Sequence, residues 1–359
     1  MAKIIQAFPL SNMELPNRVV VSPMCQYSGY DGFANDWHLV HLGQFAIGKA
    51  GAVIQEATAI APEGRISFWD LGIWKDDHIE KYRQITTFIK SQGSIPGIQL
   101  AHAGRKGSDR KPWEGKAQYL PEHEFGWQTV APSAIPFHEK DHPPLELSRT
   151  AIQDIVVRFR EAAERAIKSG YEIIEIHAAH GYLIHQFLSP LVNLRNDEYG
   201  GSFENRIRFL LEVVDAVAPL TANQSLWVRI SASDWAEGGW DVEQSVALAK
   251  ILKERGVEVI DVSSGGAVRH QKIDVGPNYQ VPFAEKIKRE SGLITAAVGM
   301  ITSGIQAEAI VENEQADLVL VARAFLDDPH FVYHAAADLA ADLDWAEQYA
   351  RAKGTIERG

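Results

Sequence analysis

The sequence contains a single cysteine, Cys25, among 359 residues. One cysteine excludes an internal disulfide framework, a four-cysteine zinc site and a cysteine-ligated iron–sulfur cluster. No apolar stretch reaches the roughly 20 residues that a membrane-spanning helix requires, and residues 1–9 lack the basic segment and apolar core of a secretion signal. We therefore expect a cytoplasmic protein without a membrane partner.

An excess of positive charge is also absent. The chain has 35 Lys and Arg residues against 47 Asp and Glu residues, a net charge of −12. This balance offers no electrostatic surface for a phosphate polymer, so nucleic acid is not an expected partner. No G-x-G-x-x-G motif occurs, which removes the usual signal of a dinucleotide-binding fold. The 46% content of hydrophobic residues is that of an ordinary globular protein with a large core.

Eight short runs rich in Val and Ile recur along the chain. Most are apolar on both faces, as parallel strands covered by helices are. The predicted strands are Arg18–Ser22, Ala52–Glu56, Ile95–Leu100, Ile173–His177, Leu226–Ile230, Val257–Ser263, Ile294–Val298 and Leu318–Ala322.

Helical patterns lie between these runs, for example Thr150–Lys168, in which apolar residues recur at spacings of three and four. A glycine follows several helical runs and precedes a strand, as glycines at helix C-termini do; these are Gly51, Gly93, Gly170, Gly256 and Gly292. Eight alternations without a break in composition predict one α/β domain over residues 1–359, a single (β/α)8 TIM barrel.

Two connections are longer than simple turns, and long loops in compact domains are usually functional. The first, residues 101–147, follows the third strand and contains six prolines together with Trp113, Phe125 and Trp127. This composition favours a semi-rigid lid or capping segment. The second, residues 178–203, follows the fourth strand.

Polar side chains cluster at the carboxyl ends of the predicted strands, where active sites of such barrels lie. In chain order they include Ser22 to Tyr27, Glu56, Thr58, Gln99, His102, Arg105, Lys106, His177, His180, Tyr182, Arg229, Ser231, Ser263, Ser264, Gly299 and Arg323. Their convergence on one mouth predicts a ligand site. Gly299 and Arg323 follow the seventh and eighth strands, where barrel phosphate sites recur, and this favours a phosphorylated ligand.

His177 and His180 lie three residues apart across a strand end. Zinc is a disfavoured interpretation, because metal hydrolase barrels usually add carboxylates to their histidines, and we expect no metal. Two imidazole donors suit an oxygen that gains negative charge during a reaction. Tyr182 carries a phenol that can donate a proton.

The pattern resembles the old yellow enzyme family of FMN-dependent ene-reductases, in particular the bacterial branch of xenobiotic reductases and NADPH dehydrogenases. The resemblance covers nearly the whole chain. Its most specific parts are Ser22 to Tyr27, Gln99 with His102 to Lys106, His177 to Tyr182, Tyr199 to Ser202 with Asn205 and Arg206, and Gly299 through Arg323.

The resemblance implies a role for each matching residue. Those expected to line the isoalloxazine of FMN are Pro23, Met24, Cys25, Ala57, Gln99 and Arg229; those expected to hold its phosphate are Gly299, Ala322 and Arg323. His177 and His180 would bind the activating oxygen of the substrate, Tyr27 would help position it, and Tyr182 would protonate its α-carbon. Cys25 would tune the flavin potential.

The reaction implied is ping-pong reduction of an activated alkene, an enone or a nitro compound, with NADPH or NADH as the hydride donor. Two other hypotheses remain open. One is a different FMN-dependent barrel dehydrogenase, acting for example on dihydroorotate or a hydroxyacid. The other is a non-catalytic protein that binds flavin and phenols.

The resemblance also implies a homodimer or homotetramer. In this branch the C-terminal tail of one subunit contributes an aromatic residue or an arginine to its own or a neighbouring site. The tail here is residues 338–359, with Arg351 and Arg358 as candidates and Trp345 as a less favoured one.

Overall fold

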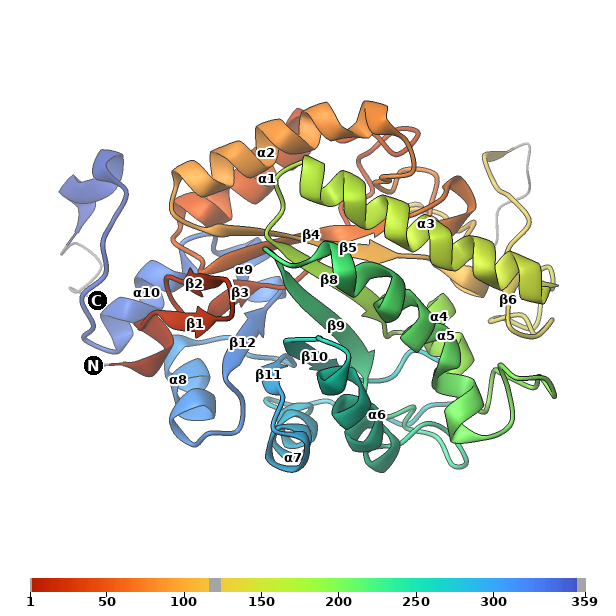
Figure 1. The fold of residues 1–359 in the computed structure, drawn as a ribbon. Helices are drawn as coiled ribbons and strands as arrows, with labels where there is room; N and C mark the ends of the chain where they lie inside the picture. The colour runs from red at the N-terminus through yellow and green to blue at the C-terminus, as the bar shows by residue number, and fades with distance from the viewer. Residues whose placement is uncertain (1, 116–123, 354–359) are drawn as a thin grey trace.

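Eight parallel strands close into a barrel, each beside its predecessor along the chain (Figure 1). The structure, a computed structural model, describes residues 2–115 and 124–353. The barrel strands are β3 (Val19–Val21), β4 (Ala52–Ala59), β5 (Ile95–Ala101), β8 (Ile173–Ala178), β9 (Ser225–Ser231), β10 (Val259–Ser263), β11 (Ile294–Ala297) and β12 (Leu318–Val321). All eight predicted strands are present, and the predicted TIM barrel is confirmed.

Helices surround the barrel (Figure 1), and their apolar residues form the core between helices and strands. They are α1 (Asp36–Ile47), α2 (Ile79–Ser91), α3 (Arg149–Lys168), α4 (Leu183–Leu188), α5 (Phe203–Val217), α6 (Val242–Glu254), α7 (Val281–Ser291), α8 (Gly304–Glu312), α9 (Arg323–Asp327) and α10 (Phe331–Asp338). Side-chain oxygens of Ser148, Ser202, Asp241 and Ser303 accept backbone N–H groups and so fix the starts of four of them. No helix in the described ranges is long and apolar enough to cross a membrane.

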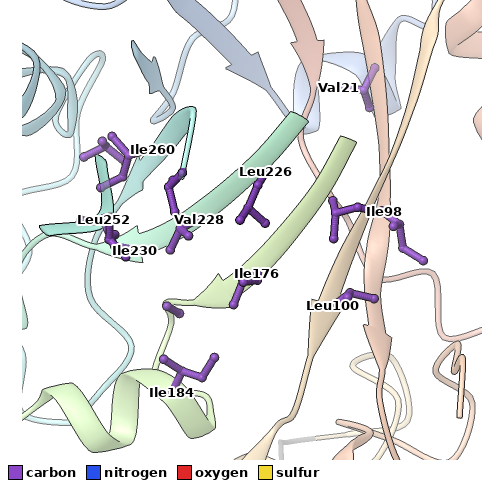
Figure 2. Close-up of a cluster of buried hydrophobic side chains, with 14 of the residues drawn as sticks. Val21, Ile98, Leu100, Ile176, Ile184, Leu226, Val228, Ile230, Leu252 and Ile260 are labelled. Carbon is purple, nitrogen blue, oxygen red and sulfur yellow. The ribbon is translucent and has the colours of Figure 1, made fainter. Parts of the chain in front are cut away.

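Side chains alternate between the two faces of each barrel strand. In β3, Val19 and Val21 belong to the outer core beneath the helices, whereas Val20 belongs to the core inside the barrel. Figure 2 shows strand residues that face outward in this way, such as Ile98, Ile176 and Val228. Leu252 of helix α6 belongs to the same cluster. Burial on both faces explains the continuous apolar runs in the sequence.

The interior of the barrel changes character from one end to the other. At the amino ends of the strands it is apolar and includes Trp227 and Val259. The antiparallel pair β1 (Phe8–Leu10) and β2 (Met13–Leu15) adds Leu10 and Leu15 to this layer. Two residues beyond Trp227 and Val259, the same inward face of β9 and β10 presents the charged side chains of Arg229 and Asp261. This charged layer therefore lies nearer to the carboxyl ends of the strands, next to the mouth of the barrel.

Four predicted C-terminal glycines have the left-handed conformation that ends a helix, with φ between +64° and +91°; these are Gly93, Gly170, Gly256 and Gly292. The prediction for Gly51 is wrong. Its φ is not positive, and α1 has already ended at Ile47. Glycine is required there because a Cβ would lie 2.2 Å from the carbonyl oxygen of Asn17.

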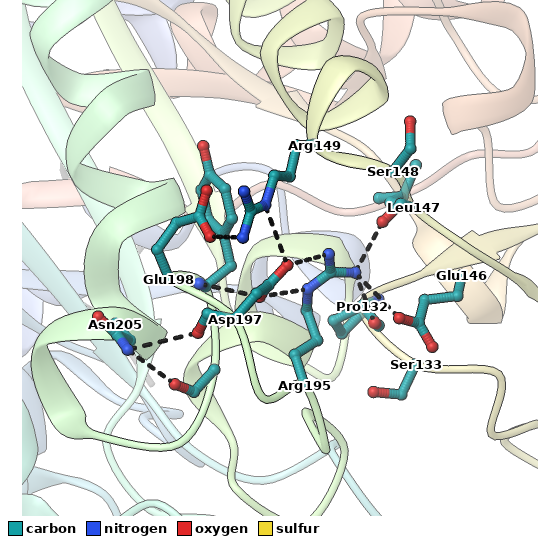
Figure 3. A network of polar contacts seen from close by, with 12 residues as sticks. Pro132, Ser133, Glu146, Leu147, Ser148, Arg149, Arg195, Asp197, Glu198 and Asn205 are labelled. Atoms are coloured by element: carbon teal, nitrogen blue, oxygen red, sulfur yellow. Dashed lines mark hydrogen bonds and ion pairs between the residues drawn. The ribbon is translucent and has the colours of Figure 1, made fainter.

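The two long connections are joined by a polar network around Arg195 (Figure 3). Its guanidinium donates to the carbonyl oxygens of Pro132 (3.0 Å) and Leu147 (2.7 Å), and it pairs with both oxygens of Asp197. The first connection also contains a short parallel pair, β6 (Val130–Ala131) and β7 (Leu145–Glu146). The second is not a continuous loop, since it contains α4. The base of the capping segment is therefore fixed to the loop that follows β8.

The C-terminal tail packs on α10, at the side of the barrel where the N-terminus lies (Figure 1). Trp345 stacks on Tyr333 with ring centroids 4.2 Å apart, and the backbone N–H of Ala346 donates to the Tyr333 hydroxyl. Arg351 is exposed on a short 3-10 helix, Glu347–Ala352. Arg358 lies outside the described residues.

Candidate active site

Three predicted site residues meet at the end of β8. The His177 ring lies 5.1 Å from the His180 ring and 5.1 Å from the Tyr182 ring, in edge-to-face contacts. The chain must turn sharply to bring them together, and His180 and Gly181 both have left-handed backbones, with φ of +58° and +72°. A Cβ on Gly181 would lie 2.0 Å from the carbonyl oxygen of Gly266, so only glycine fits.

Both imidazoles are neutral. Burial, and next the positive charge of Arg229, lowers the pKa of His177 and of His180 well below 6.5. The Nδ1 of His177 accepts the backbone N–H of Ala179 (3.3 Å), so its proton resides on Nε2. The Nε2 of His180 lies 2.7 Å from the Ser263 hydroxyl, which leaves Nδ1 as its available ring nitrogen.

Tyr182 is held beside a half-buried amine. The Nζ of Lys106 lies 5.1 Å from the Tyr182 ring and donates to the carbonyl oxygen of His180 (2.8 Å). Burial, followed by the charge of Arg105, lowers the pKa of Lys106 to about 8. Burial, with the Cys25 thiol as the next cause, raises the pKa of Tyr182 well above its usual value of 10, so its phenol remains protonated.

A charged layer lies inside the barrel, below this loop. Arg229 of β9 forms an ion pair with Asp261 of β10 (2.9 Å) and donates to Ser22 Oγ (3.1 Å). Gln99 donates to the Glu175 carboxyl (2.7 Å). Burial raises the pKa of Glu175 and of Asp261, and Arg229 opposes both shifts. One arginine thus faces two carboxyl groups at the mouth of the barrel.

A cavity of about 670 Å³ opens beside this layer, between the ends of β9 to β12. Arg229, Gly299, Ala322 and Arg323 all line it. Arg323 is exposed, and within the described ranges no hydrogen bond or ion pair engages its side chain. Gly299 has φ +129°, and a Cβ there would meet the Gln280 amide at 3.0 Å. This end of the cavity therefore offers a free guanidinium and a bare backbone, which suit a phosphate.

The loop after β3 also lies at the mouth of the barrel, close enough to the β8 loop for the Cys25 thiol to affect the pKa of Tyr182. Tyr27 has φ +50° and contacts Trp113 of the capping segment in an edge-to-face arrangement, 5.9 Å between centroids. A bulge in β4 at Gln55 and Ala57 directs Glu56 to this loop, where its carboxylate accepts the backbone N–H of Gln26. Burial, followed by the charges of Asp70 and Glu56, raises the pKa of Cys25, while hydrogen bonding to the backbone of Ala57 opposes that shift.

Most predicted site residues do not line the large cavity; only Arg229, Gly299, Ala322 and Arg323 do. Met24 lines a separate, much smaller cavity beside Glu56. The predicted residues that line neither are Pro23, Cys25, Tyr27, Ala57, Gln99, His177, His180 and Tyr182. Sequence reasoning missed Asp261, although its position two residues before Ser263 puts it on the inward face of β10. Within residues 2–115 and 124–353, no three His, Cys, Asp or Glu side chains are grouped to hold a metal ion.

Comparison with known sequences identifies relatives over nearly the full chain. Residues 3–342 match the model of the NADH:flavin oxidoreductase / NADH oxidase family. The NADPH dehydrogenase of Bacillus velezensis is 47% identical over 352 residues, covering 98% of this chain and 99% of that one. The NADPH dehydrogenase of Bacillus subtilis is 46% identical over 351 residues, covering 97% and 98%.

Comparison with solved structures identifies proteins with the same barrel fold. Morphinone reductase superposes with a TM-score of 0.78 at 29% sequence identity, covering 95% of this chain and 90% of that one. The old yellow enzyme homologue from Zymomonas mobilis has a TM-score of 0.78 at 24% identity, covering 95% and 94%. The barrel fold is therefore shared with these proteins.

Proposed function

Because the chain belongs to the NADH:flavin oxidoreductase / NADH oxidase family and is an oxidoreductase of the old yellow enzyme type, we propose that it is an FMN-dependent ene-reductase. Its substrates would be α,β-unsaturated carbonyl or nitro compounds, reduced at the C=C bond. The observation that carries this proposal is the meeting of His177, His180 and Tyr182, with Nε2 of His180 2.7 Å from Oγ of Ser263, which lines the same cavity as Arg323.

The residues present fit FMN. Arg323 and the backbone at Gly299 and Ala322 would hold the phosphate. Arg229 would face the pyrimidine edge, and Asp261 and Ser22 hold its guanidinium in place. Pro23, Met24, Cys25, Ala57 and Gln99 would complete the ring site. When bound, FMN supplies hydride transfer, from NAD(P)H in one half-reaction and to the activated alkene in the other.

Substrate activation would depend on the two neutral histidines. Among the described residues, no acceptor engages Nε2 of His177, which is therefore available as a donor. Nδ1 of His180 becomes a donor when the Ser263 hydroxyl donates to Nε2 of His180. Two N–H groups held in place before the reaction stabilise the negative charge that grows on the carbonyl or nitro oxygen, and one such donor is typically worth about 3 kcal/mol. A neutral donor also avoids the cost of burying a second cation near Arg229.

Tyr182 would supply the proton to the substrate α-carbon. Its raised pKa keeps the phenol protonated, and Lys106 holds the neighbouring backbone in position. Tyr27, on the loop after β3, would help orient the substrate, and Trp113 covers Tyr27 from the capping segment. We propose that the described parts of residues 101–147 exclude water from the site in this way.

NADPH is the proposed hydride donor, because the Bacillus relatives are named NADPH dehydrogenases; NADH remains an alternative donor. A cytoplasmic location, a homodimer or homotetramer, and a contribution of the C-terminal tail to its own or a neighbouring site stay predictions.

The test is the visible absorption spectrum of the purified protein, before and after anaerobic addition of NADPH. We expect a yellow protein that bleaches with NADPH and regains its colour with cyclohexenone. A colourless protein that cannot be reconstituted with FMN would overturn the proposal. A protein that bleaches but does not recolour with cyclohexenone would retain the flavin and exclude the ene-reductase assignment.

A further inference from the structure

A buried carboxylate–imidazole pair stands directly behind the turn at His180 to Tyr182. His185 of α4 and Asp234 of the loop after β9 are both fully buried, and Nε2 of His185 lies 2.8 Å from Oδ1 of Asp234. The backbone N–H of Gly181 donates to Nδ1 of His185 (2.8 Å). Neither side chain is among the residues that line the cavity, and the proposed reaction does not use either of them.

The direction of each hydrogen bond is determined by the groups involved. Gly181 N–H can only donate, so Nδ1 of His185 carries no proton and Nε2 carries one. That proton points at Asp234. The other oxygen of Asp234 accepts the Ser189 hydroxyl (2.6 Å) and the backbone N–H of Trp240 (2.8 Å). The pKa of Asp234 lies below its usual value, since His185 and these donors outweigh the opposing effect of burial.

The turn needs such an anchor because its conformation is strained. A non-glycine residue in the left-handed region, such as His180, costs about 1–2 kcal/mol. Other side chains also hold the backbone of this turn. Ser231 Oγ accepts from the N–H of His180 (2.9 Å), and the Gln186 amide donates to the carbonyl oxygen of Gly181 (2.8 Å). The hydrogen bond of the Gly181 N–H lies between His180 and Tyr182 in the chain, and it forms only in one tautomer of the His185 imidazole.

We propose that Asp234 and His185 are positioning residues for the reaction. Asp234 holds His185 in the Nε2–H tautomer, and Nδ1 of His185 then holds the left-handed turn that places His180 and Tyr182 over the substrate. This inference rests on the proposed function for its kinetic consequences, whereas its structural part stands on the geometry alone.

The decisive variant is Asp234→Asn, which is nearly isosteric. The Trp240 N–H and the Ser189 hydroxyl keep the amide oxygen on their side, so the amide NH₂ faces His185. It donates to Nε2 and moves the ring proton to Nδ1, where it opposes the Gly181 N–H. A carboxylate-to-amide change of this kind produces the wrong tautomer in the Ser-His-Asp triad. Ser189→Ala is the matched control, because it removes a bond to the same carboxylate without changing the tautomer.

We would measure two properties of the holoenzyme. The first is hydrogen exchange of the peptide that contains Gly181. The second is the rate of each half-reaction, bleaching by NADPH and recolouring by cyclohexenone. For D234N we expect exchange about tenfold faster, corresponding to one lost hydrogen bond, and recolouring about 100-fold slower, as for a misplacement of about 1 Å. FMN content and bleaching should change little. S189A should lower thermal stability and leave both the exchange and the ratio of the two rates as in the wild type.

Equal effects of D234N and S189A on the ratio of the half-reactions would overturn the proposal, as would unchanged exchange in D234N. Should D234N fail to fold, His185→Gln replaces it. The Gln amide can donate to Asp234 in place of Nε2 but has no acceptor at the position of Nδ1, so exchange of Gly181 should be about tenfold faster in H185Q. Unchanged slow exchange in H185Q would overturn the proposed anchor. A wild-type protein that does not reduce cyclohexenone would refute the proposed function, but the exchange comparison would still decide the anchor.

Discussion

The loop after β3 and the loop after β8 both lie at the mouth of the barrel, and each contains a non-glycine residue in the left-handed region, Tyr27 and His180. In each loop, a backbone N–H next to that residue donates to a buried side chain. For the β3 loop this is the N–H of Gln26, and for the β8 loop it is that of Gly181. Behind each stands a buried acid and a buried histidine.

The order of the two groups differs. In the β3 loop the carboxylate of Glu56 accepts the backbone N–H itself, and His38 lies behind it, 3.3 Å away. In the β8 loop the imidazole of His185 accepts the N–H, and Asp234 lies behind it at 2.8 Å. A carboxylate accepts a hydrogen bond in any state of its neighbour, whereas an imidazole nitrogen accepts only in one tautomer. The loop that carries the proposed chemistry therefore depends on a longer chain of contacts.

The largest effect should come from removing both donors of the β8 loop, His177→Ala with His180→Ala. We expect cyclohexenone reduction to fall about 1000-fold or more, since one such donor alone is typically worth 100- to 1000-fold. FMN content and bleaching by NADPH should fall far less. Stopped-flow measurement of both half-reactions tests this, and unchanged recolouring would refute the assigned role.

The two tyrosines should separate the loops next. Tyr182→Phe should slow recolouring by about 100-fold, the lower range for loss of a general acid. Tyr27→Phe should cost about fivefold, the net value of one neutral hydrogen bond. The same rapid-mixing measurement applies to both variants. Equal losses would mean that the proton does not come from the β8 loop alone.

The pH dependence of stability should report on the two histidines of the β8 loop. The pKa of His177 and His180 is lowered in the folded protein, so below pH 6.5 the unfolded chain binds protons that the native protein does not. Stability should therefore fall as the pH falls, by up to about 2 kcal/mol per ring at pH 5. Urea unfolding at pH 7 and pH 5 should show a smaller loss in the double His variant than in the wild type.

A neutral amide at the β3 loop should have a small effect. In Glu56→Gln the amide oxygen can still accept the Gln26 N–H, so the loop should remain held. We expect a loss of about 1 kcal/mol in the free energy of unfolding and a ratio of half-reaction rates close to that of the wild type. Denaturant unfolding and rapid mixing measure these quantities. A change in the ratio as large as that in D234N would remove the distinction between the loops.

The smallest change in turnover should follow Cys25→Ser in the β3 loop. Burial raises the pKa of the thiol, so serine replaces a neutral group by a more polar one. We expect a shifted flavin midpoint potential with turnover retained, checked by spectroelectrochemistry and steady-state assay. Complete loss of FMN or of activity would contradict the tuning role.

Much of the barrel could be predicted because its signals are local. Runs of Val and Ile, helices with one apolar stripe and glycines at helix ends each report on a few neighbouring residues, and they gave all eight strands. The exceptions are instructive. Gly51 is required by the carbonyl of Asn17, and α4 lies in a segment that was expected to be a loop. The reason for Gly51 is a contact with a residue that is distant in the sequence. The helix α4 has only six residues, too few for a clear apolar period in the sequence.

The sequence by itself determined which side chains reach the mouth of the barrel, because parallel strands deliver their carboxyl ends to one face and alternate their side chains. Only the tertiary structure decided how those side chains are held. Asp234 and His185 are 49 residues apart, and Glu56 and His38 are on different elements. No spacing encodes which atom of each pair receives the backbone N–H of a loop. That choice arises from the packing of helices and loops around a closed barrel, where every buried polar group must find a partner.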